Sequence, residues 1–163
     1  MKKRQKWMAC GAGLLIIALA MPSYGLSVKT AKGEFTLSER IEKKVKAGEK
    51  LVFKWSAWAP AAPFFDSVRD GVADAAKDFK VDAKVIGPAD SVAEKQVAEL
   101  ETLIRAQQVD GIAVSGAEED TLLPVINMAF DNRIPVIAAN IDNPRSKRFL
   151  FLGQELYMSG WVA

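Results

Sequence analysis

The stretch that decides the fold is residues 51–88, which read LVFKWSAWAPAAPFFDSVRDGVADAAKDFKVDAKVIGP. It begins with an apolar strand, Leu51–Ser56, and ends with a second one, Val81–Ile86, closed by Gly87-Pro88. Between them apolar residues recur at helical spacing from Phe65 to Phe79. A strand, a helix and a strand within about 30 residues form a parallel βαβ unit.

The same alternation continues toward the carboxyl terminus. Apolar spacing predicts helices over 93–104 and 122–130, and strands at Gly111–Ser115, Ile134–Ala139 and Phe149–Leu152. The strands are apolar on both faces, as expected when helices cover both faces of a parallel sheet. The sequence therefore predicts an α/β fold, a doubly wound parallel sheet with helices on both faces.

The first 25 residues have the layout of a bacterial secretory signal. Four basic residues precede an apolar stretch, Met8–Met21, and small residues at Ser23 and Gly25 offer a cleavage site. Cleavage is expected after Gly25, with Ala20 as a second candidate. The alternative is an uncleaved anchor, but the apolar stretch would span only about 21 Å of a ~30 Å bilayer core. The predicted location is periplasmic.

Removing residues 1–25 changes the charge balance. The remaining chain has 18 basic and 20 acidic residues, so its net charge is −2 and nucleic acid is not an expected partner. Residues 26–50 form a polar arm with a predicted helix at about 37–47. Thr36 and Glu39 have the spacing of a capping box, and Gly48 can end the helix.

Composition excludes several kinds of catalytic and metal site. The 163 residues include no histidine and a single cysteine, Cys10, which rules out imidazole-based triads and cysteine-rich zinc sites. The carboxylates at 118–120 are consecutive and are expected to complement the amino end of a helix rather than to bind a metal. We predict no enzyme activity, no catalytic residue, no metal and no cofactor.

Candidate ligand-binding residues follow the strands, because ligands of such sheets meet the carboxyl ends of the strands. The first loop carries Trp58 and Phe64, with Phe65 expected to lie at least partly in the core. It contains no glycine, so it is a poor phosphate cradle, whereas flat aromatic rings suit the faces of a sugar. The alternative for Trp58 is packing against the arm helix.

Polar candidates follow two further strands. Ser115 ends the third strand and could simply lead into a helix. Asn140 and Asp142 follow the fourth strand and can exchange hydrogen bonds with hydroxyl groups. Their alternative is turn formation, since Asp142-Asn143-Pro144 is also a good turn. The basic residues at 145, 147 and 148 are expected to form a solvated cluster.

Several motifs, taken in order, resemble one known family. They are Pro63-Phe64-Phe65-x-x-Val68-x-x-Gly71, Gln96-Val97-x-x-Leu100-x-x-Leu103-Ile104, Val109-Asp110-Gly111-Ile112-Ala113-Val114-Ser115, Ile134-Pro135-Val136-Ile137 and Gly153-Gln154-x-x-Tyr157-x-x-Gly160. This order and spacing resembles the periplasmic sugar-binding proteins of ABC transporters, of the ribose-binding type, over residues 51–163. These are two-lobed proteins that close on a sugar and deliver it to a membrane permease.

The resemblance implies how the site and the domains are organised. It places Phe64 and Phe65 against the sugar, and Asn140 and Asp142 at its hydroxyl groups. Ala62 and Ile141 depart from the family pattern, as does Glu155-Leu156, so the sugar is left open. The implied domains are an amino-terminal sugar-binding lobe over residues 51–154 and the start of a truncated second lobe over residues 155–163.

The implied partners are a small sugar or sugar-like ligand and an inner-membrane ABC permease, with the full-length protein a monomer. A chain holding only one lobe is expected to bind sugar weakly. Two other functions use the same fold: the sensing module of a membrane receptor, and the effector domain of a repressor. A repressor needs a cytoplasmic helix-turn-helix where this sequence has a secretory signal. An enzyme on a flavodoxin-like sheet would need titratable groups at the strand ends, where only Asp142 and Glu118–Asp120 are available.

Overall fold

The structure, a computed structural model, describes residues 26–30, 32–154 and 160–161. Its centre is a five-stranded sheet in the order β4-β3-β5-β6-β7, with every neighbouring pair parallel. The strands are β3 (Val52–Ala57), β4 (Asp82–Ile86), β5 (Gly111–Ser115), β6 (Val136–Ala139) and β7 (Phe151–Leu152). The predicted signal segment lies outside the described residues, as does most of the segment assigned to a second lobe.

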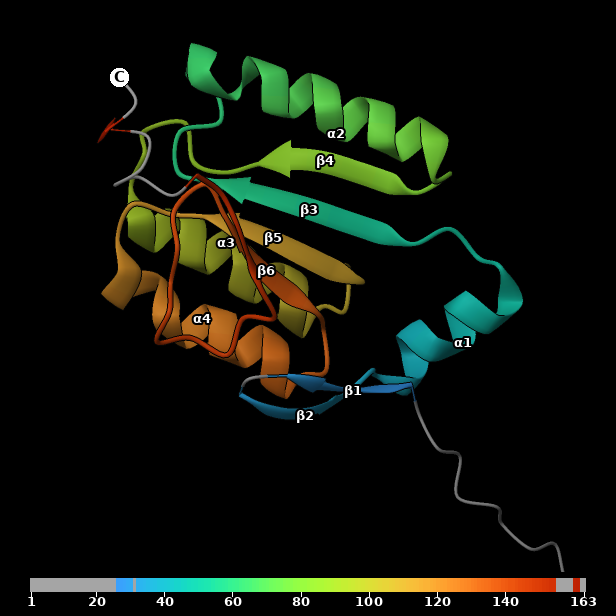
Figure 1. Cartoon of the computed structure of the whole chain (residues 1–163). Coiled ribbons are helices and arrows are strands. Elements are labelled where there is room, and N and C mark those ends of the chain that lie inside the picture. Colours follow the sequence, from blue (N-terminus) through green and yellow to red (C-terminus); the bar gives the residue numbers. More distant parts are fainter. Residues whose placement is uncertain (1–25, 31, 155–159, 162–163) are drawn as a thin grey trace, which may run out of the picture.

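Helices lie on both faces of the sheet, which confirms the predicted fold (Figure 1). Helix α2 (Asp66–Asp78) packs on one face, against β4, and follows a short 3-10 turn at Pro63–Phe65. Helices α3 (Ala93–Arg105) and α4 (Glu119–Asp131) pack side by side on the other face. Right-handed crossovers explain this division, because the chain moves outward from β3 to β4 and then back across the sheet to β5 and β6.

The hydrophobic core lies on the α3 and α4 face. Along β5 and β6, the residues that point to this face are buried, whereas Ala113 and Ile137 between them are half-buried. Helix α2 contains no buried residue at all. The buried core consists of Ile41, Leu100, Ile104, Val109, Ile112, Val114, Leu122, Val125, Ile126, Ala129, Ile134 and Val136.

The amino-terminal arm contains more structure than the sequence predicted. Strands β1 (Ser27–Thr30) and β2 (Gly33–Thr36) form an antiparallel hairpin ahead of helix α1 (Glu39–Ala47). The expected helix is present, and Gly48 ends it in a left-handed conformation. Its predicted cap was wrong: Ser38, not Thr36, accepts the hydrogen bond from the Ile41 N–H, because Thr36 is still paired in the hairpin.

The arm is fastened to the amino-terminal edge of the sheet through Asp110, whose side chain is fully buried. This carboxylate accepts hydrogen bonds from Arg40, from Lys44 at 2.9 Å and from the Val52 N–H at 2.8 Å. Burial by itself raises the pKa of Asp110. The bonds from Lys44, the Val52 N–H and Arg40 outweigh that effect and hold the pKa below its ordinary value.

Candidate functional site

The carboxyl ends of β3, β5 and β6 meet at the edge of the sheet opposite the arm (Figure 1). The loop after β3 carries Trp58, Phe64 and Phe65, and the loop after β6 carries Asn140 and Asp142. The sequence predicted this edge as the place where functional residues gather. Because Trp58 lies here and α1 lies at the other edge, the alternative that Trp58 packs against the arm helix is wrong.

Three rings form what we call the aromatic platform: Trp58, Phe64 and Phe65. Phe65 is fully buried, as expected of a residue at least partly in the core. Its ring meets Phe64 edge-on at 5.1 Å and Trp58 edge-on at 6.2 Å between centroids. Phe64 is 61% exposed, so it is the ring of the platform that presents a free face to solvent. Phe65 supports its two neighbours and has no exposed surface of its own.

The loop that bears Trp58 is held tightly at its start. The Trp58 N–H donates to the Ser115 carbonyl at 3.0 Å, which joins the ends of β3 and β5. Gly87, after β4, has a φ of +143°, and a Cβ there would lie 2.0 Å from the Ala57 carbonyl oxygen. Only glycine permits this approach, so β4 confines the loop from the other side.

Ser115 is fully buried, and its hydroxyl oxygen has no hydrogen-bond partner among the described residues. The same holds for the indole N–H of Trp58. Both groups lie at the end of β3 or β5, where the backbone bond between Trp58 and Ser115 brings the residues together. Buried polar groups without partners are uncommon in folded proteins. This edge of the sheet therefore has polar groups that can still form hydrogen bonds.

Asn140 and Asp142 stand on the loop that leaves β6. Asn140 has a φ of +65°, and its N–H donates to the Leu152 carbonyl of β7 at 2.8 Å. The Asp142 carboxylate forms a two-point ion pair with Arg148, one bond of which is 2.8 Å long. It also accepts from the Asn143 N–H, in keeping with the alternative of turn formation.

The predicted site residues therefore fall into two groups on one edge of the sheet. Direct contacts connect Trp58, Phe64, Phe65 and Ser115. Asn140 and Asp142 form the second group, on the loop after β6, a strand that is separated from β3 by β5. A cleft bounded by both groups would offer ring faces on one side and amide and carboxylate groups on the other.

Arg145 and Lys147 of the loop after β6 are solvent-exposed, as expected of a solvated cluster, but the sequence did not predict their carboxylate partners. Arg145 binds Glu119 and Asp120, in the first turn of α4, and Lys147 binds Asp131 at the end of that helix. Arg148 binds Asp142. Each cation thus has a carboxylate partner, and the loop is attached along the length of α4.

Two functional candidates escaped the sequence analysis. Arg148 was grouped with its basic neighbours, and no local pattern pairs it with Asp142. Gln96 was read only as part of a helical motif, although it is fully buried and donates to Ser56 Oγ at 3.0 Å. The sequence did contain a sign of this role, because Gln96 is a polar residue on the buried stripe of α3. The other members of that stripe are Ala93, Leu100 and Ile104.

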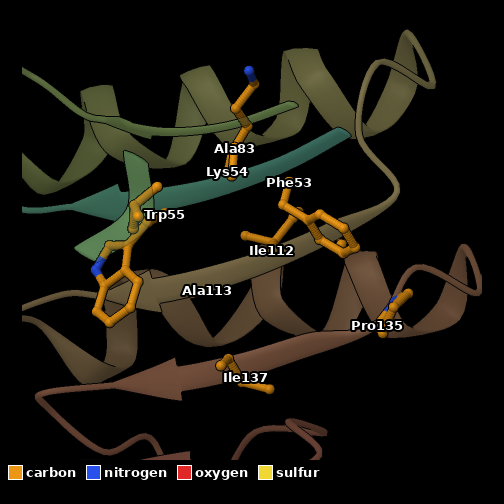
Figure 2. A pocket seen from close by; sticks show the side chains of 10 residues that line it. Phe53, Lys54, Trp55, Ala83, Ile112, Ala113, Pro135 and Ile137 are labelled. Carbon is orange, nitrogen blue, oxygen red and sulfur yellow. The ribbon is translucent and has the colours of Figure 1, made fainter. Parts of the chain in front are cut away.

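The α2 face of the sheet carries a separate apolar hollow, away from the strand ends. A cavity of about 220 Å³ lies beside α2 over β3, β5 and β6, and Figure 2 shows Phe53, Trp55, Ala113 and Ile137 around it. A second hollow of about 690 Å³ shares Phe53 and Trp55 with it and reaches Phe79. Their lining has almost no polar groups to orient a ligand.

Two absences hold for the described part of the chain. No group of three or more acidic, histidine or cysteine side chains there is arranged to hold a metal ion. Nor does any helix there combine the length and the apolar composition needed to cross a bilayer.

The fold is an α/β lobe with the candidate residues at one edge of its sheet, and comparison with known proteins gives its family. Residues 53–163 match the model of the periplasmic binding protein domain, and the chain belongs to this family. The family is made of binding proteins rather than enzymes. A comparison with curated protein sequences finds no match.

Solved structures of sugar-binding proteins have the same fold. GanP, a glucose-galactose binding protein from Geobacillus stearothermophilus, is 31% identical, with a TM-score of 0.65 over 70% of this chain and 40% of its own. An ABC transporter solute-binding protein from Burkholderia graminis, in complex with D-arabinose, is 28% identical, with a TM-score of 0.64 over 69% of this chain and 38% of its own.

A carbohydrate transporter from Acidothermus cellulolyticus, in complex with myo-inositol, is 29% identical, with a TM-score of 0.62 over 69% of this chain and 40% of its own. The chain is thus homologous to sugar-binding periplasmic proteins and spans about 40% of the length of these structures.

Proposed function

We propose that the chain is the ligand-binding lobe of an extracytoplasmic solute-binding protein that captures a sugar or sugar-like molecule for import through an ABC permease. The observation that carries this proposal is the exposed Phe64 ring, supported by buried Phe65, at the carboxyl edge of the sheet. A ring held in this way can stack on the apolar face of a sugar without losing much conformational freedom.

The polar half of the proposed site consists of Asn140 and Asp142. Their amide and carboxylate groups can bind adjacent hydroxyl groups, and Arg148 holds the carboxylate in place from one side. The solved relatives are named for, or contain, glucose or galactose, D-arabinose and myo-inositol. All are polyhydroxylated rings, which is the ligand chemistry that we propose for this chain.

Isothermal titration calorimetry with D-glucose, D-galactose, D-arabinose and myo-inositol tests the proposal. We expect dissociation constants of the order of millimolar, because one lobe supplies only one wall of a two-lobed cleft. Phe64→Ala should weaken binding at least about fivefold through loss of the stacking ring. Phe79→Ala is the matched control, since Phe79 is 77% exposed but lies at the far end of α2.

Two results would count against this proposal. No heat with any of the four compounds at about 50 mM would count against capture of these ligands by this lobe, since millimolar affinity saturates there. We propose that a second lobe, beginning at residues 155–163, completes the cleft. Micromolar binding by this chain would contradict that part of the proposal.

We also propose that residues 1–25 are a cleaved secretory signal and that the protein acts in the periplasm. The basic start and the short apolar stretch Met8–Met21 support this. Mass spectrometry of the exported protein should give an amino terminus at Leu26. An intact amino terminus in the membrane fraction would instead favour the sensing module of a receptor.

A further inference from the structure

A buried polar cluster joins helix α3 to the carboxyl ends of β3 and β5. The side chains of Gln96, Ser56 and Ser115 are all fully buried. Gln96 Nε2 donates to Ser56 Oγ at 3.0 Å and to the Ser115 carbonyl at 3.2 Å. One side-chain amide therefore fixes the ends of two neighbouring strands to a helix that packs on one face of the sheet.

The Ser115 carbonyl connects this cluster to the aromatic platform. The Ser115 carbonyl oxygen also accepts a hydrogen bond from the Trp58 N–H at 3.0 Å. The Gln96 side chain and the Trp58 backbone therefore donate to the same oxygen atom. The Trp58 ring in turn packs on Phe65, which supports exposed Phe64. A displacement of the Ser115 carbonyl would therefore pass into the backbone of Trp58 and from there into the platform.

Stability alone does not account for Gln96. Its Oε1 is buried and has no hydrogen-bond partner among the described residues, which is an unfavourable state for an amide oxygen. The other buried residues on this stripe of α3 are Ala93, Leu100 and Ile104. A leucine at position 96 would fill a similar volume and remove the unpaired oxygen, but it would also take the donor from the buried Ser56 hydroxyl. Compared with leucine, the Gln96 amide contributes the two hydrogen bonds that Nε2 donates, to Ser56 Oγ and to the Ser115 carbonyl.

We propose that Gln96 is the positioning residue of the candidate site: through the Ser115 carbonyl it holds the Trp58 backbone and so sets where the aromatic platform stands. The platform's contact with a ligand rests on the proposed function. The dependence of Trp58 on Gln96 is a property of the chain itself and can be measured without any ligand.

The first test uses Trp58 as a fluorescent probe. Replacing Trp7, Trp55 and Trp161 by phenylalanine leaves Trp58 as the single tryptophan of the chain. In this background Gln96→Leu should raise the acrylamide quenching constant about twofold, since the loop gains local freedom. Leu100→Ala, one turn along α3 and equally buried, destabilises the core without touching Ser115 and should leave quenching unchanged.

Both variants are compared at a temperature where circular dichroism shows them fully folded. Equal quenching in Gln96→Leu and in the parent would overturn the proposal. So would an increase of the same size in Leu100→Ala, because it would show that any loss of core packing loosens the loop.

Amide hydrogen exchange supplies a second test, and its first comparison needs no substitution. In the unaltered chain the Trp58 amide should exchange as slowly as the Val114 amide of β5, because its bond to Ser115 is anchored by Gln96. Free exchange at Trp58 would overturn the proposal even if Gln96→Leu failed to fold. In Gln96→Met, protection at Trp58 should fall about tenfold and protection at Val114 should stay.

Adding D-arabinose separates the two proposals. A change in fluorescence of the chain whose single tryptophan is Trp58, or in Trp58 amide exchange of the unaltered chain, supports ligand contact at the platform. Its absence counts against the proposed function only, because the quenching and exchange comparisons decide the role of Gln96 in the free chain.

Discussion

Asn140 combines an unusual backbone conformation with a position in the candidate site. Its φ of +65° lies in the left-handed region, which asparagine enters more readily than most side chains. The conformation turns the chain away from β6 while the Asn140 N–H still bonds to β7. Strained backbone often occurs where a protein must orient a functional group, which is consistent with a ligand-directed amide here.

This conformation makes a clean test of the Asn140 side chain possible. Asn140→Gly should keep the free energy of unfolding within about 0.5 kcal/mol, because glycine adopts this φ freely. Asn140→Ala should lower the free energy of unfolding by about 1 kcal/mol, since the left-handed conformation is unfavourable for alanine. Urea denaturation measures both.

If the amide binds a ligand, both Asn140 variants should lose sugar affinity to the same extent, although only the alanine variant is destabilised. Calorimetry provides this comparison. Unchanged sugar binding in the stable glycine variant would contradict the assignment of Asn140 to the site.

At the level of elements, the spacing of apolar residues predicted the sheet and its helices, because burial of one face requires apolar residues at the period of the element. Helix α3 is clear in the sequence, since Ala93, Leu100 and Ile104 lie on one buried stripe. The hairpin of β1 and β2 was missed because each strand has four residues and only Phe35 is buried, so alternation hardly shows. Short, exposed strands leave too weak a pattern to predict.

The candidate site was predictable to the extent that topology governs it. The loops that hold Trp58, Asn140 and Asp142 could be predicted from the positions of the strand ends alone, with no contact between residues known. Partners of those residues were not predictable in the same way. Gln96 reaches Ser56 across 40 positions, and which polar residues meet over such separations is fixed by packing rather than by local spacing.

The contact between α1 and the sheet depends on the ionised form of Asp110. The folded-state pKa of this carboxyl is below its unfolded value, so its contribution to stability is complete above about pH 5 and is lost as the pH falls through the folded pKa. We expect Asp110→Asn to lower the free energy of unfolding at pH 7 by about 2 to 3 kcal/mol, because Arg40 and Lys44 lose their partner.

The pH dependence provides the stricter form of this prediction. Between about pH 5 and 2, the unaltered chain should lose more stability than the Asp110→Asn variant, and the two should converge at the acidic end. Urea denaturation at each pH measures the difference. A difference that stayed constant across this range would show that the carboxylate charge is not what holds α1.

For the whole molecule, the two faces of the sheet are covered unequally. Both α3 and α4 bury one face. Among the residues that the structure describes, α2 is the only helix on the other face, where it lies beside a hollow lined by Phe53, Trp55 and Ile137 (Figure 2). A sheet of this kind is stabilised by helices on both faces. Large contiguous apolar surfaces are unusual on folded domains and often mark places where other molecules bind.

We therefore expect the folded chain to bind the apolar dye ANS on the α2 face. Ile137→Gln should reduce the dye fluorescence to about half, because it places an amide in the middle of the hollow. Val28→Gln is the control: Val28 is 51% exposed on β1, in the hairpin that packs through Phe35 on Phe130 of α4, and its replacement should leave the signal unchanged. Equal losses in the two variants, or no dye binding by the folded chain, would mean that this face is not an accessible apolar surface in solution.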